Sequence, residues 1–278
     1  MTDDWRALNI ANWESRVPVH VGPGGYPLEM FDDPSHLSKV VRYDVPRLGR
    51  LDGLDVVHLQ CHIGTDTVSL ARLGARSTTG LDFSPSALME ARKLAARAAA
   101  DVTFVDGDVY DAVDLLGAHR FDVVYTGIGA ICWLPSIRRW AAVVAGLLRP
   151  GGRLFMREGH PMLWSISDPR PDGLLVVEYP YFETDGAIFR EETSYAGDGT
   201  LSAPDSVSFN HGLGEIFTAL RDAGLTMTSF EEHREVPWNA LGDAMAPSAE
   251  FPGEFVLAEG RDRLPLTYTV QAVYRADT

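Results

Sequence analysis

The chain has 278 residues, 45% of them hydrophobic, and its 24 Lys and Arg against 39 Asp and Glu give a formal net charge of −15. This length and apolar content can bury the core of one large α/β domain, or of a core domain with a smaller cap, and they argue against disorder. The acidic balance repels phosphate backbones and anionic lipids, so we expect neither a nucleic-acid partner nor a membrane partner.

The cysteines and the N-terminus indicate the compartment. Cys61 and Cys132 are the only two cysteines, and their spacing suggests neither a disulfide framework nor a zinc site. The first residues, MTDDWRAL, carry acids where a signal peptide needs bases. No apolar run approaches the roughly twenty residues of a membrane span. We therefore expect a cytoplasmic protein.

Residues 1–50 predict a short helix near Trp5, a Pro- and Gly-rich loop over 21–27 and a helix over 37–48. Trp13 and Tyr26 would be costly to leave in water, so we expect them to pack against other parts of the protein. They either fill the core or close over a substrate as part of a lid.

From 51 to 160, strand and helix patterns alternate. Apolar runs predict strands starting at Val56 and over 78–81, 102–105, 121–126 and 153–156. Apolar residues at helical spacing predict helices over 68–73, 85–99 and 137–148, the second with Ser84 as its cap. This regular alternation implies right-handed parallel crossovers and a doubly wound α/β sheet.

The alternation stops after Gly159. Residues 161–210 are rich in aromatic and acidic side chains. Their short β-like runs suggest antiparallel strands in an insertion that covers the binding face. A helix over 213–220 and strands over 225–230 and 266–271 follow, with an irregular lid loop over 233–265. We divide the chain into an N-terminal cap or lid (1–50), a core (51–160), an insert (161–210) and a C-terminal completion of the core (211–278).

Two features of the core predict a nucleoside site. The segment VVHLQCHIGTD (56–66) places a turn with Gly64 after a strand, and Thr65 can cap the helix that follows. Backbone N–H groups at such a junction face any ligand bound there. Asp82 follows the second strand, where a carboxylate can accept hydrogen bonds from both hydroxyls of a ribose.

Five segments, in this order and at this spacing, resemble the class I S-adenosylmethionine-dependent methyltransferases over roughly 51–160. They are VVHLQCHIGTDT, GLDFS, DGDVYD, FDVVYTGIGAICWL and LLRPGGRLF. The resemblance implies a Rossmann-like fold with a mostly parallel, seven-stranded sheet whose last strand is antiparallel. It also implies S-adenosylmethionine as the cofactor and S-adenosylhomocysteine as the product.

The same resemblance implies specific contacts with the cofactor. Asp82 should hold the ribose hydroxyls, and Phe83 should lie against the adenine. Asp108 should accept a hydrogen bond from the adenine amino group, while Val109 offers its backbone N–H. The backbone around Gly64 and Thr65 should face the cofactor.

The chain departs from the family at the glycine turn. An acid is usual where His58 stands, and glycines are usual where Gln60 and His62 stand. Gln and His fit there only if their side chains point aside. In this HLQCHxG variant we expect Gln60 or His62 to hydrogen-bond the methionine moiety. We expect His58 to satisfy a buried partner, and no metal site, because Cys61 faces away from these side chains on a strand.

Methyl transfer is an in-line displacement that depends mainly on alignment of the acceptor and exclusion of water. Cofactor and acceptor should meet at Thr126 and Gly127, which end the fourth strand. The candidate bases are Glu158 and His160, after the fifth strand, and His211, before the late helix. The two histidines also have structural alternatives, as a turn donor and as part of a helix cap.

Four aromatic residues are expected to line the acceptor pocket: Trp13, Tyr26, Trp133 and Trp164. The alternative is that such rings fill the core of the insert. An aromatic, acid-tinged lining suits a neutral or cationic small molecule, methylated at nitrogen or oxygen. Two other functions stay open: a non-catalytic adenosyl-binding protein, and an NAD-dependent oxidoreductase, although GxGxxG is absent.

Overall fold

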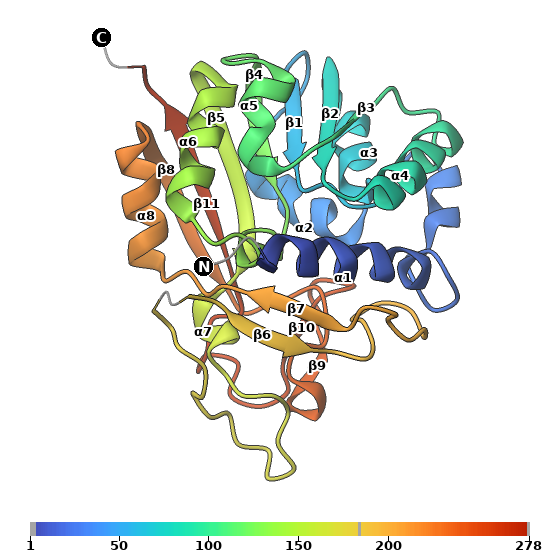
Figure 1. Cartoon of the computed structure of the whole chain (residues 1–278), viewed down its shortest axis with the longest axis vertical. Coiled ribbons are helices and arrows are strands. Elements are labelled where there is room, and N and C mark those ends of the chain that lie inside the picture. Colours follow the sequence, from blue (N-terminus) through green and yellow to red (C-terminus); the bar gives the residue numbers. More distant parts are fainter. Residues whose placement is uncertain (1–3, 183–184, 277–278) are drawn as a thin grey trace.

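The computed structural model describes residues 4–182 and 185–276. Its centre is a seven-stranded sheet in the order β3-β2-β1-β4-β5-β11-β8 (Figure 1). Its strands are β1 (Asp55–Leu59), β2 (Ser77–Asp82), β3 (Thr103–Asp106), β4 (Phe121–Thr126), β5 (Leu148–Gly159), β8 (Leu225–His233) and β11 (Thr267–Tyr274). Two small antiparallel pairs lie outside it, β6 (Ala187–Arg190) with β7 (Asp205–Ser208) and β9 (Met245–Pro247) with β10 (Phe255–Leu257).

Strand direction matches the predicted architecture. The ladders that join β3, β2, β1, β4 and β5 are all parallel, whereas β11 runs antiparallel to both β5 and β8. The predicted doubly wound, mostly parallel sheet with an antiparallel last strand is therefore confirmed. Strand order reverses beside β1, so ligands are expected at the carboxyl ends of β1 and β4.

The helices begin where the sequence supplies caps. They are α1 (Asp4–His20), α2 (Lys39–Leu48), α3 (Thr65–Arg72), α4 (Pro85–Arg97), α5 (Ala112–Leu116), α6 (Ile137–Leu147), α7 (Pro161–Trp164) and α8 (Leu213–Asp222). The hydroxyls of Ser38, Ser84 and Ser136 accept backbone N–H groups in the first turns of α2, α4 and α6. Helix α1 is much longer than the short helix predicted near Trp5.

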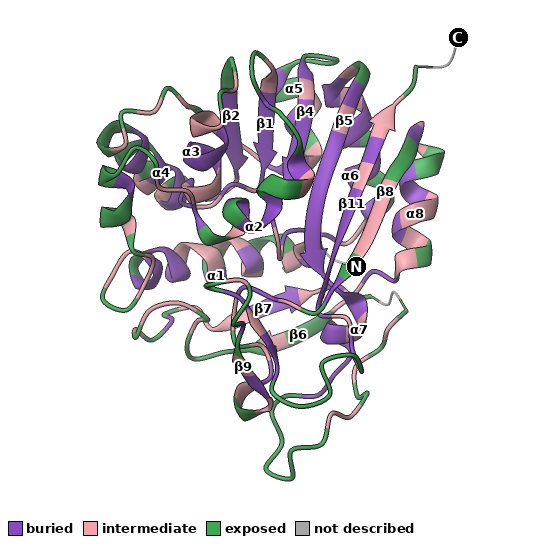
Figure 2. Ribbon diagram, turned by 180° about the vertical axis from the view of Figure 1, so that it is seen from behind, coloured by how far each residue is buried: buried purple, intermediate pink, exposed green. Residues whose placement is uncertain are grey.

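Apolar side chains on both faces of the sheet are buried beneath helices. On one face, α6 and α8 pack on β4, β5 and β11, with Trp140 fully buried among them. On the other face, Val41 of α2 and Leu70 of α3 pack on β1 and β4. Figure 2 shows this burial along the central strands. Such near-continuous burial explains why the predicted strands read as apolar runs rather than alternating patterns.

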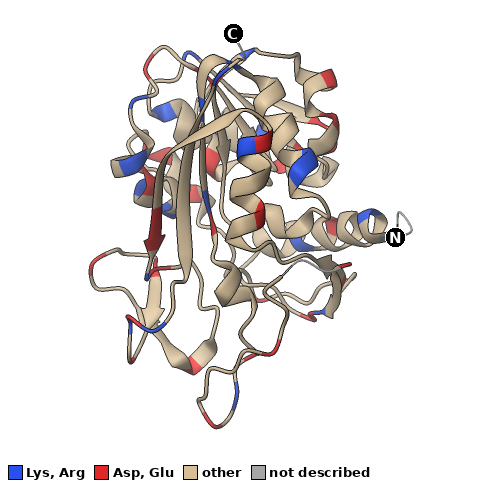
Figure 3. Ribbon diagram, turned by 90° about the vertical axis from the view of Figure 1, so that its left-hand side faces the viewer, with Lys and Arg blue, Asp and Glu red and all other residues tan. Residues whose placement is uncertain are grey.

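Charged residues lie mainly on the helices and loops around the sheet, with acidic and basic positions interspersed (Figure 3). Several exposed arginines pair with carboxylates of other elements. Arg138 of α6 lies 2.8 Å from Asp222 of α8, and Arg190 of β6 lies 3.0 Å from Asp205 of β7. The positive charge of these arginines is therefore balanced locally on the surface.

Beyond the carboxyl ends of the strands lie α1 and a cap, which we define as residues 161–210 and 234–266. Figure 1 shows α1 crossing beneath the sheet, with β6 and β7 beside it. The cap has a small apolar core of its own around Leu163 and Val236. In the part of the chain that the structure describes, no helix has the length and hydropathy needed to cross a bilayer.

Candidate active site

The glycine loop, residues 60–64, joins β1 to α3 in a left-handed path. Gly64 has φ 78°, and two residues with side chains, Gln60 and His62, also have positive φ, of 57° and 49°. Each such non-glycine residue costs on the order of 1–3 kcal/mol and needs support from its surroundings. Backbone bonds to β2 supply it: the Cys61 N–H donates to Leu81 O over 3.0 Å. The Gln60 side chain donates to Ala130 O, and the His62 ring lies 2.7 Å from His20 Nδ1.

Asp82 lies at the tip of β2 and anchors this loop. Its Oδ2 accepts the His62 N–H over 2.8 Å, and its Oδ1 accepts the Ser84 N–H over 2.9 Å. Burial raises the pKa of Asp82 to about 6. Among the described residues no cationic side chain pairs with it. Each carboxylate oxygen therefore keeps a lone pair for a further donor.

Asp108 caps the short helix η2 (Val109–Asp111) and faces α1. Its Oδ1 accepts the Tyr110 N–H over 2.8 Å, and its Oδ2 lies 2.9 Å from Arg6 Nε. Asp108 is buried, as is Val109 beside it. The carboxylate that should meet the adenine amino group is thus held by an arginine from α1 in this structure.

The loop after β4 is fixed from β5. Glu158, fully buried, accepts backbone N–H groups from Gly129, Ala130 and Ile131 at 2.6–3.0 Å, as well as its neighbour's. Burial raises the pKa of Glu158 to about 7 against the opposing effect of these donors. Gln60 Nε2 donates to Ala130 O over 3.0 Å and ties the glycine loop to the same segment.

An aromatic cluster fills the space between α1, the glycine loop and η3 (Ile131–Trp133). Its members are Trp13, His20, Tyr26, His62, Trp133 and Tyr195. Ring centroids of Trp13 lie 5.0 Å from His62 and 5.4 Å from Trp133. The Arg16 guanidinium, almost fully buried, lies over the Trp13 ring at 5.5 Å.

Three of the four predicted pocket aromatics meet in this cluster. Trp164 is the exception, because it stacks on Trp238 in the cap at 5.7 Å. His20, Arg16 and Tyr195 were not singled out from the sequence. Their spacing could have linked Arg16 and His20 to Trp13, because residues three and four apart share one face of a helix such as α1.

The three predicted bases have structural partners on different elements. His160 Nε2 lies 3.1 Å from Glu232, and its Nδ1 accepts the Met162 N–H. His211 Nε2 lies 2.8 Å from Leu134 O. Glu158 holds the loop after β4 through its backbone donors. A catalytic role for these residues stays a prediction.

His58 has the buried partner that was expected, because its Nδ1 lies 2.9 Å from Thr67 Oγ1. Burial lowers the pKa of His58 to about 3. A Cβ added to Gly127 would lie 3.4 Å from both His58 Nε2 and Asp66 Oδ2, so these groups crowd the end of β4. Across residues 4–182 and 185–276, no three His, Cys, Asp or Glu side chains gather as metal ligands would.

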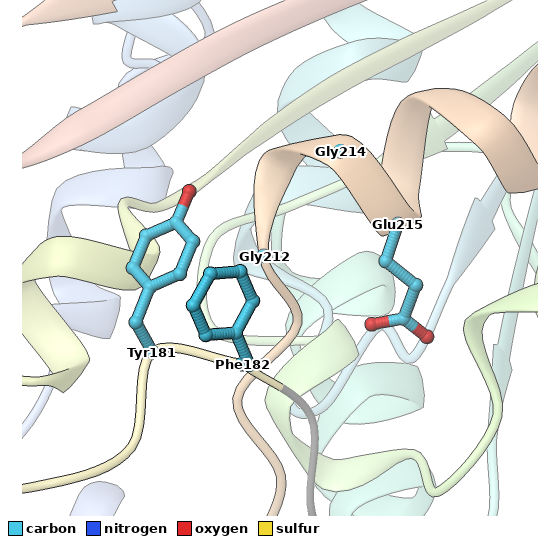
Figure 4. A pocket seen from close by; sticks show the side chains of 5 residues that line it. All are labelled: Tyr181, Phe182, Gly212, Gly214 and Glu215. Atoms are coloured by element: carbon cyan, nitrogen blue, oxygen red, sulfur yellow. The ribbon is translucent and has the colours of Figure 1, made fainter.

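A separate cavity of about 230 Å³ lies at the start of α8. Figure 4 shows Tyr181 and Phe182 side by side across from Glu215, with Gly212 and Gly214 behind them. None of these residues belongs to the glycine loop or to the aromatic cluster. The cavity is therefore distinct from the predicted cofactor site.

Comparison with known proteins agrees with this geometry. Residues 57–154, from β1 into β5, match the family model described as a methyltransferase domain. The match covers about a third of the chain. The matched segment holds the glycine loop, Asp82, Asp108 and the end of β4.

Solved structures of methyltransferases share the fold of the whole chain. An S-adenosylmethionine-dependent methyltransferase from Mesorhizobium loti is 24% identical, with a TM-score of 0.61 over 85% of this chain and 98% of that one. Magnesium protoporphyrin IX methyltransferase from Synechocystis PCC 6803, solved with bound S-adenosylhomocysteine, is 15% identical, with a TM-score of 0.55 over 98% of each chain.

A curated relative matches over a shorter stretch. It is a ribosomal protein L11 methyltransferase from Vibrio cholerae, 31% identical over 106 residues. These residues make up 38% of this chain and 34% of that protein. The chain thus spans about a third of the length of this relative.

The resemblance of the sequence implies S-adenosylmethionine as the cofactor, and one of the similar structures holds S-adenosylhomocysteine. The residues present fit it. Gln60 Oε1 and Thr126 Oγ1 are buried polar atoms that lack a hydrogen-bond partner within the described chain. Gln60 follows β1, and Thr126 ends the adjacent strand β4. Asp82 adds two free lone pairs at the next strand tip. Donor groups of an amino acid and a ribose would satisfy these atoms.

Proposed function

We propose that the protein transfers the methyl group of S-adenosylmethionine to a small-molecule acceptor, at nitrogen or oxygen. The observation that carries this proposal is the aromatic cluster, which lies directly against the glycine loop through His62 and Trp13. Aromatic walls with a few placed polar groups are typical of small-molecule sites. The reduced, buried cysteines Cys61 and Cys132 suit the cytoplasm, where we place the protein.

In this proposal the carboxyl ends of β1, β2 and β4 hold the cofactor. Asp82 accepts from the ribose hydroxyls, while Phe83 and Val109 flank the adenine, whose amino group donates to Asp108. Gln60 and Thr126 face the methionine moiety, which makes the HLQCHxG loop a variant of the family. When bound, the cofactor supplies a methyl group on a positively charged sulfur.

The chain's own contribution is alignment and exclusion of water. Glu158 fixes the backbone of Gly129 to Ile131, and Gln60 ties this backbone to the glycine loop, so two walls of the site keep a constant spacing. Trp13 and Trp133 meet edge to face beside this region, and in the proposal they limit its contact with water. Holding an acceptor at a fixed distance and angle in a dry site supplies most of the acceleration that such a displacement needs.

A protein acceptor is the second candidate, because the Vibrio relative is a ribosomal protein methyltransferase. The two candidates are separated by supplying isotope-labelled methyl donor with either a small-molecule extract or a ribosomal protein fraction. We expect label in the small-molecule fraction. Label in the proteins alone would favour the second candidate.

Binding is tested first, by thermal unfolding with S-adenosylhomocysteine. A ligand at a hundred times its Kd stabilises the folded state by about 2.7 kcal/mol, which shifts the Tm by roughly 5–10 °C for a chain of this size. NAD is the control and should leave the Tm unchanged. A shift with NAD alone would instead favour an oxidoreductase, and adenosyl binding without any labelled product would favour a non-catalytic binder.

A further inference from the structure

A series of hydrogen bonds runs through the aromatic cluster and ends on the glycine loop. Arg16 donates from Nη1 to Ser194 Oγ over 3.0 Å. Ser194 Oγ lies 2.7 Å from His20 Nε2, and His20 Nδ1 lies 2.7 Å from His62 Nε2. Four side chains from α1, the cap and the glycine loop are therefore linked in series.

The first member sets the direction of this series. A guanidinium has only donors, so Ser194 must accept from Arg16. Among the described residues the Ser194 hydroxyl has one other partner, His20 Nε2, and its hydrogen is satisfied by donating there. His20 then carries its proton on Nδ1 and donates to His62 Nε2. This leaves the single proton of His62 on Nδ1.

The arrangement requires both rings to be neutral, and their burial favours that form. Burial and the Arg16 charge lower the pKa of His20 to about 3. Burial, together with His20 and Arg16, lowers the pKa of His62 well below its usual value. A neutral imidazole has one N–H, so each ring passes donation onward in one direction. Hydrogen bonds in series polarise one another, which strengthens the last donor.

The last donor of the series is His62 Nδ1–H. Among the residues that the structure describes, His62 Nδ1 makes no hydrogen bond, although the ring packs against Trp13 and Tyr26. The backbone N–H of the same residue holds Asp82. The free donor therefore belongs to the loop that faces the predicted cofactor site, with a buried cation at the far end of its series.

We propose that His62 Nδ1–H binds a carboxylate oxygen of a ligand, with Arg16, Ser194 and His20 as positioning residues. This inference rests on the proposed function and names the ligand chemistry of its site. A cation at the head of the series favours an anionic oxygen, because charge-assisted hydrogen bonds are the stronger ones. The carboxylate has two sources, the methionine moiety of the cofactor and an acidic methyl acceptor. In the second case the acceptor is an acid rather than neutral or cationic.

The first test is a histidine-nitrogen NMR spectrum of the full chain without ligand at neutral pH. We expect His20 and His62 to carry their protons on Nδ1. Ser194→Ala should move the His20 proton to Nε2 in at least half of the molecules, whereas Ser208→Ala, a hydroxyl of the same cap outside the series, should change neither ring. A His62 proton on Nε2 in the wild type would overturn the inference.

Signals are assigned with His62→Asn, because Asn tolerates left-handed backbone. His119→Asn is the matched control, since His119 also has a positive φ, of 50°, and precedes β4 at the opposite end of the sheet. If His62→Asn does not fold, Ser194→Ala and ligand titration still identify the ring.

The second test separates the two carboxylate sources. S-adenosylhomocysteine should shift the His62 Nδ1–H signal and methylthioadenosine, which lacks the carboxylate, should not, if the cofactor is the source. His62→Asn should then weaken S-adenosylhomocysteine binding about tenfold or more, and methylthioadenosine binding little. Benzoate added to the S-adenosylhomocysteine complex should shift the signal if the acceptor is the source.

The outcomes distinguish this inference from the proposed function. Calorimetric binding of S-adenosylhomocysteine, with the His62 signal unmoved by either carboxylate, overturns the inference and leaves the methyltransferase proposal standing. Absence of S-adenosylhomocysteine binding overturns the proposed function, while the ligand-free spectrum still decides the direction of the hydrogen-bond series.

Discussion

In the proposed function, Asp82 serves both folding and binding. It uses one lone pair of each oxygen on the backbone N–H groups of His62 and Ser84, which fixes the glycine loop against β2. The remaining lone pairs have no cation to balance them among the described residues, and burial keeps the carboxylate poorly solvated. A ligand that brings hydroxyl donors would relieve this penalty, so binding and ionisation of Asp82 are coupled.

We expect Asp82→Asn to weaken S-adenosylhomocysteine binding by about 10- to 100-fold, since hydrogen bonds to a charged group contribute about 1.5–3 kcal/mol. Isothermal titration calorimetry measures the change in affinity, and circular dichroism checks that the variant is folded. Asp106→Asn is the matched control, because Asp106 is the exposed register partner of Asp82 on β3. Equal losses in both variants would argue against a ribose contact.

The same coupling predicts a pH dependence of binding. The pKa of Asp82 in the free protein is about 6, and ribose donors favour the ionised form, so affinity should fall as the pH drops through 6. Titrations with S-adenosylhomocysteine between pH 5 and 8 test this. In Asp82→Asn the profile should flatten, and a wild-type profile that is already flat would contradict the assignment.

At the scale of elements, α1 is the part that covers the predicted cofactor site. Arg6 pairs with Asp108, Glu14 accepts from the Ser84 hydroxyl, and Trp13 packs on His62. These three contacts reach the tips of β3, β2 and β1 in turn. A cofactor that uses Asp108 meets a carboxylate already paired with Arg6, so α1 and the cofactor compete for one negative charge.

We expect Arg6→Gln to speed association of S-adenosylhomocysteine several-fold, because the competing ion pair is lost. Stopped-flow tryptophan fluorescence follows this through Trp13 and Trp133. Arg138→Gln removes a comparable surface pair, with Asp222, and should leave the rate unchanged. Slower association in Arg6→Gln would mean that Arg6 assists binding instead.

The extent of α1 also shows where sequence patterns lose information. Its buried face carries polar groups, and Asn9 makes two hydrogen bonds with the Val207 backbone on β7 while Asn12 donates to Ala203 O. Apolar periodicity cannot reveal a face that is buried through hydrogen bonds to a strand about two hundred residues away. The sheet was predictable because its strands bury apolar side chains on both faces.

The places of the candidate site residues in the fold were predictable to a similar degree, whereas their roles stay predictions. Gly64, Asp82 and Asp108 could be placed because backbone turns and strand tips leave local signals. Glu158 illustrates the limit, since its position suggested a base and the structure gives it four backbone donors. Whether a carboxylate at a strand end meets substrate or backbone depends on the path of a distant loop.

For the whole molecule, buried acids tie stability to pH. Asp44, fully buried beneath β4, accepts from the Tyr125 hydroxyl, and its other oxygen is unpartnered within the described residues. Burial raises the pKa of Asp44 to about 7. A raised folded-state pKa means that the folded protein binds the proton more tightly, so its contribution is present at low pH and is lost as the pH rises toward 7.

We expect Asp44→Asn to flatten the pH dependence of the free energy of unfolding, removing on the order of 2–3 kcal/mol of the decline between pH 5 and 8. Urea unfolding at each pH measures it. Asp114→Asn, an exposed acid on α5, is the control and should keep the wild-type slope. An unchanged slope in Asp44→Asn would show that the carboxyl ionises normally in the folded chain.

Strand β5 is twelve residues long, twice the length of β4, and its final residues pair with the start of β11 next to the cap. Strands β5 and β8 lead into the cap, and β11 follows it in the chain. The cap is therefore attached to the central sheet by three strands. Helix α1, by contrast, belongs to no ladder of the central sheet and is held over the strand tips by side chains. We therefore expect ligands to enter and leave beside α1, because this helix can move without breaking the strand pairing of the central sheet.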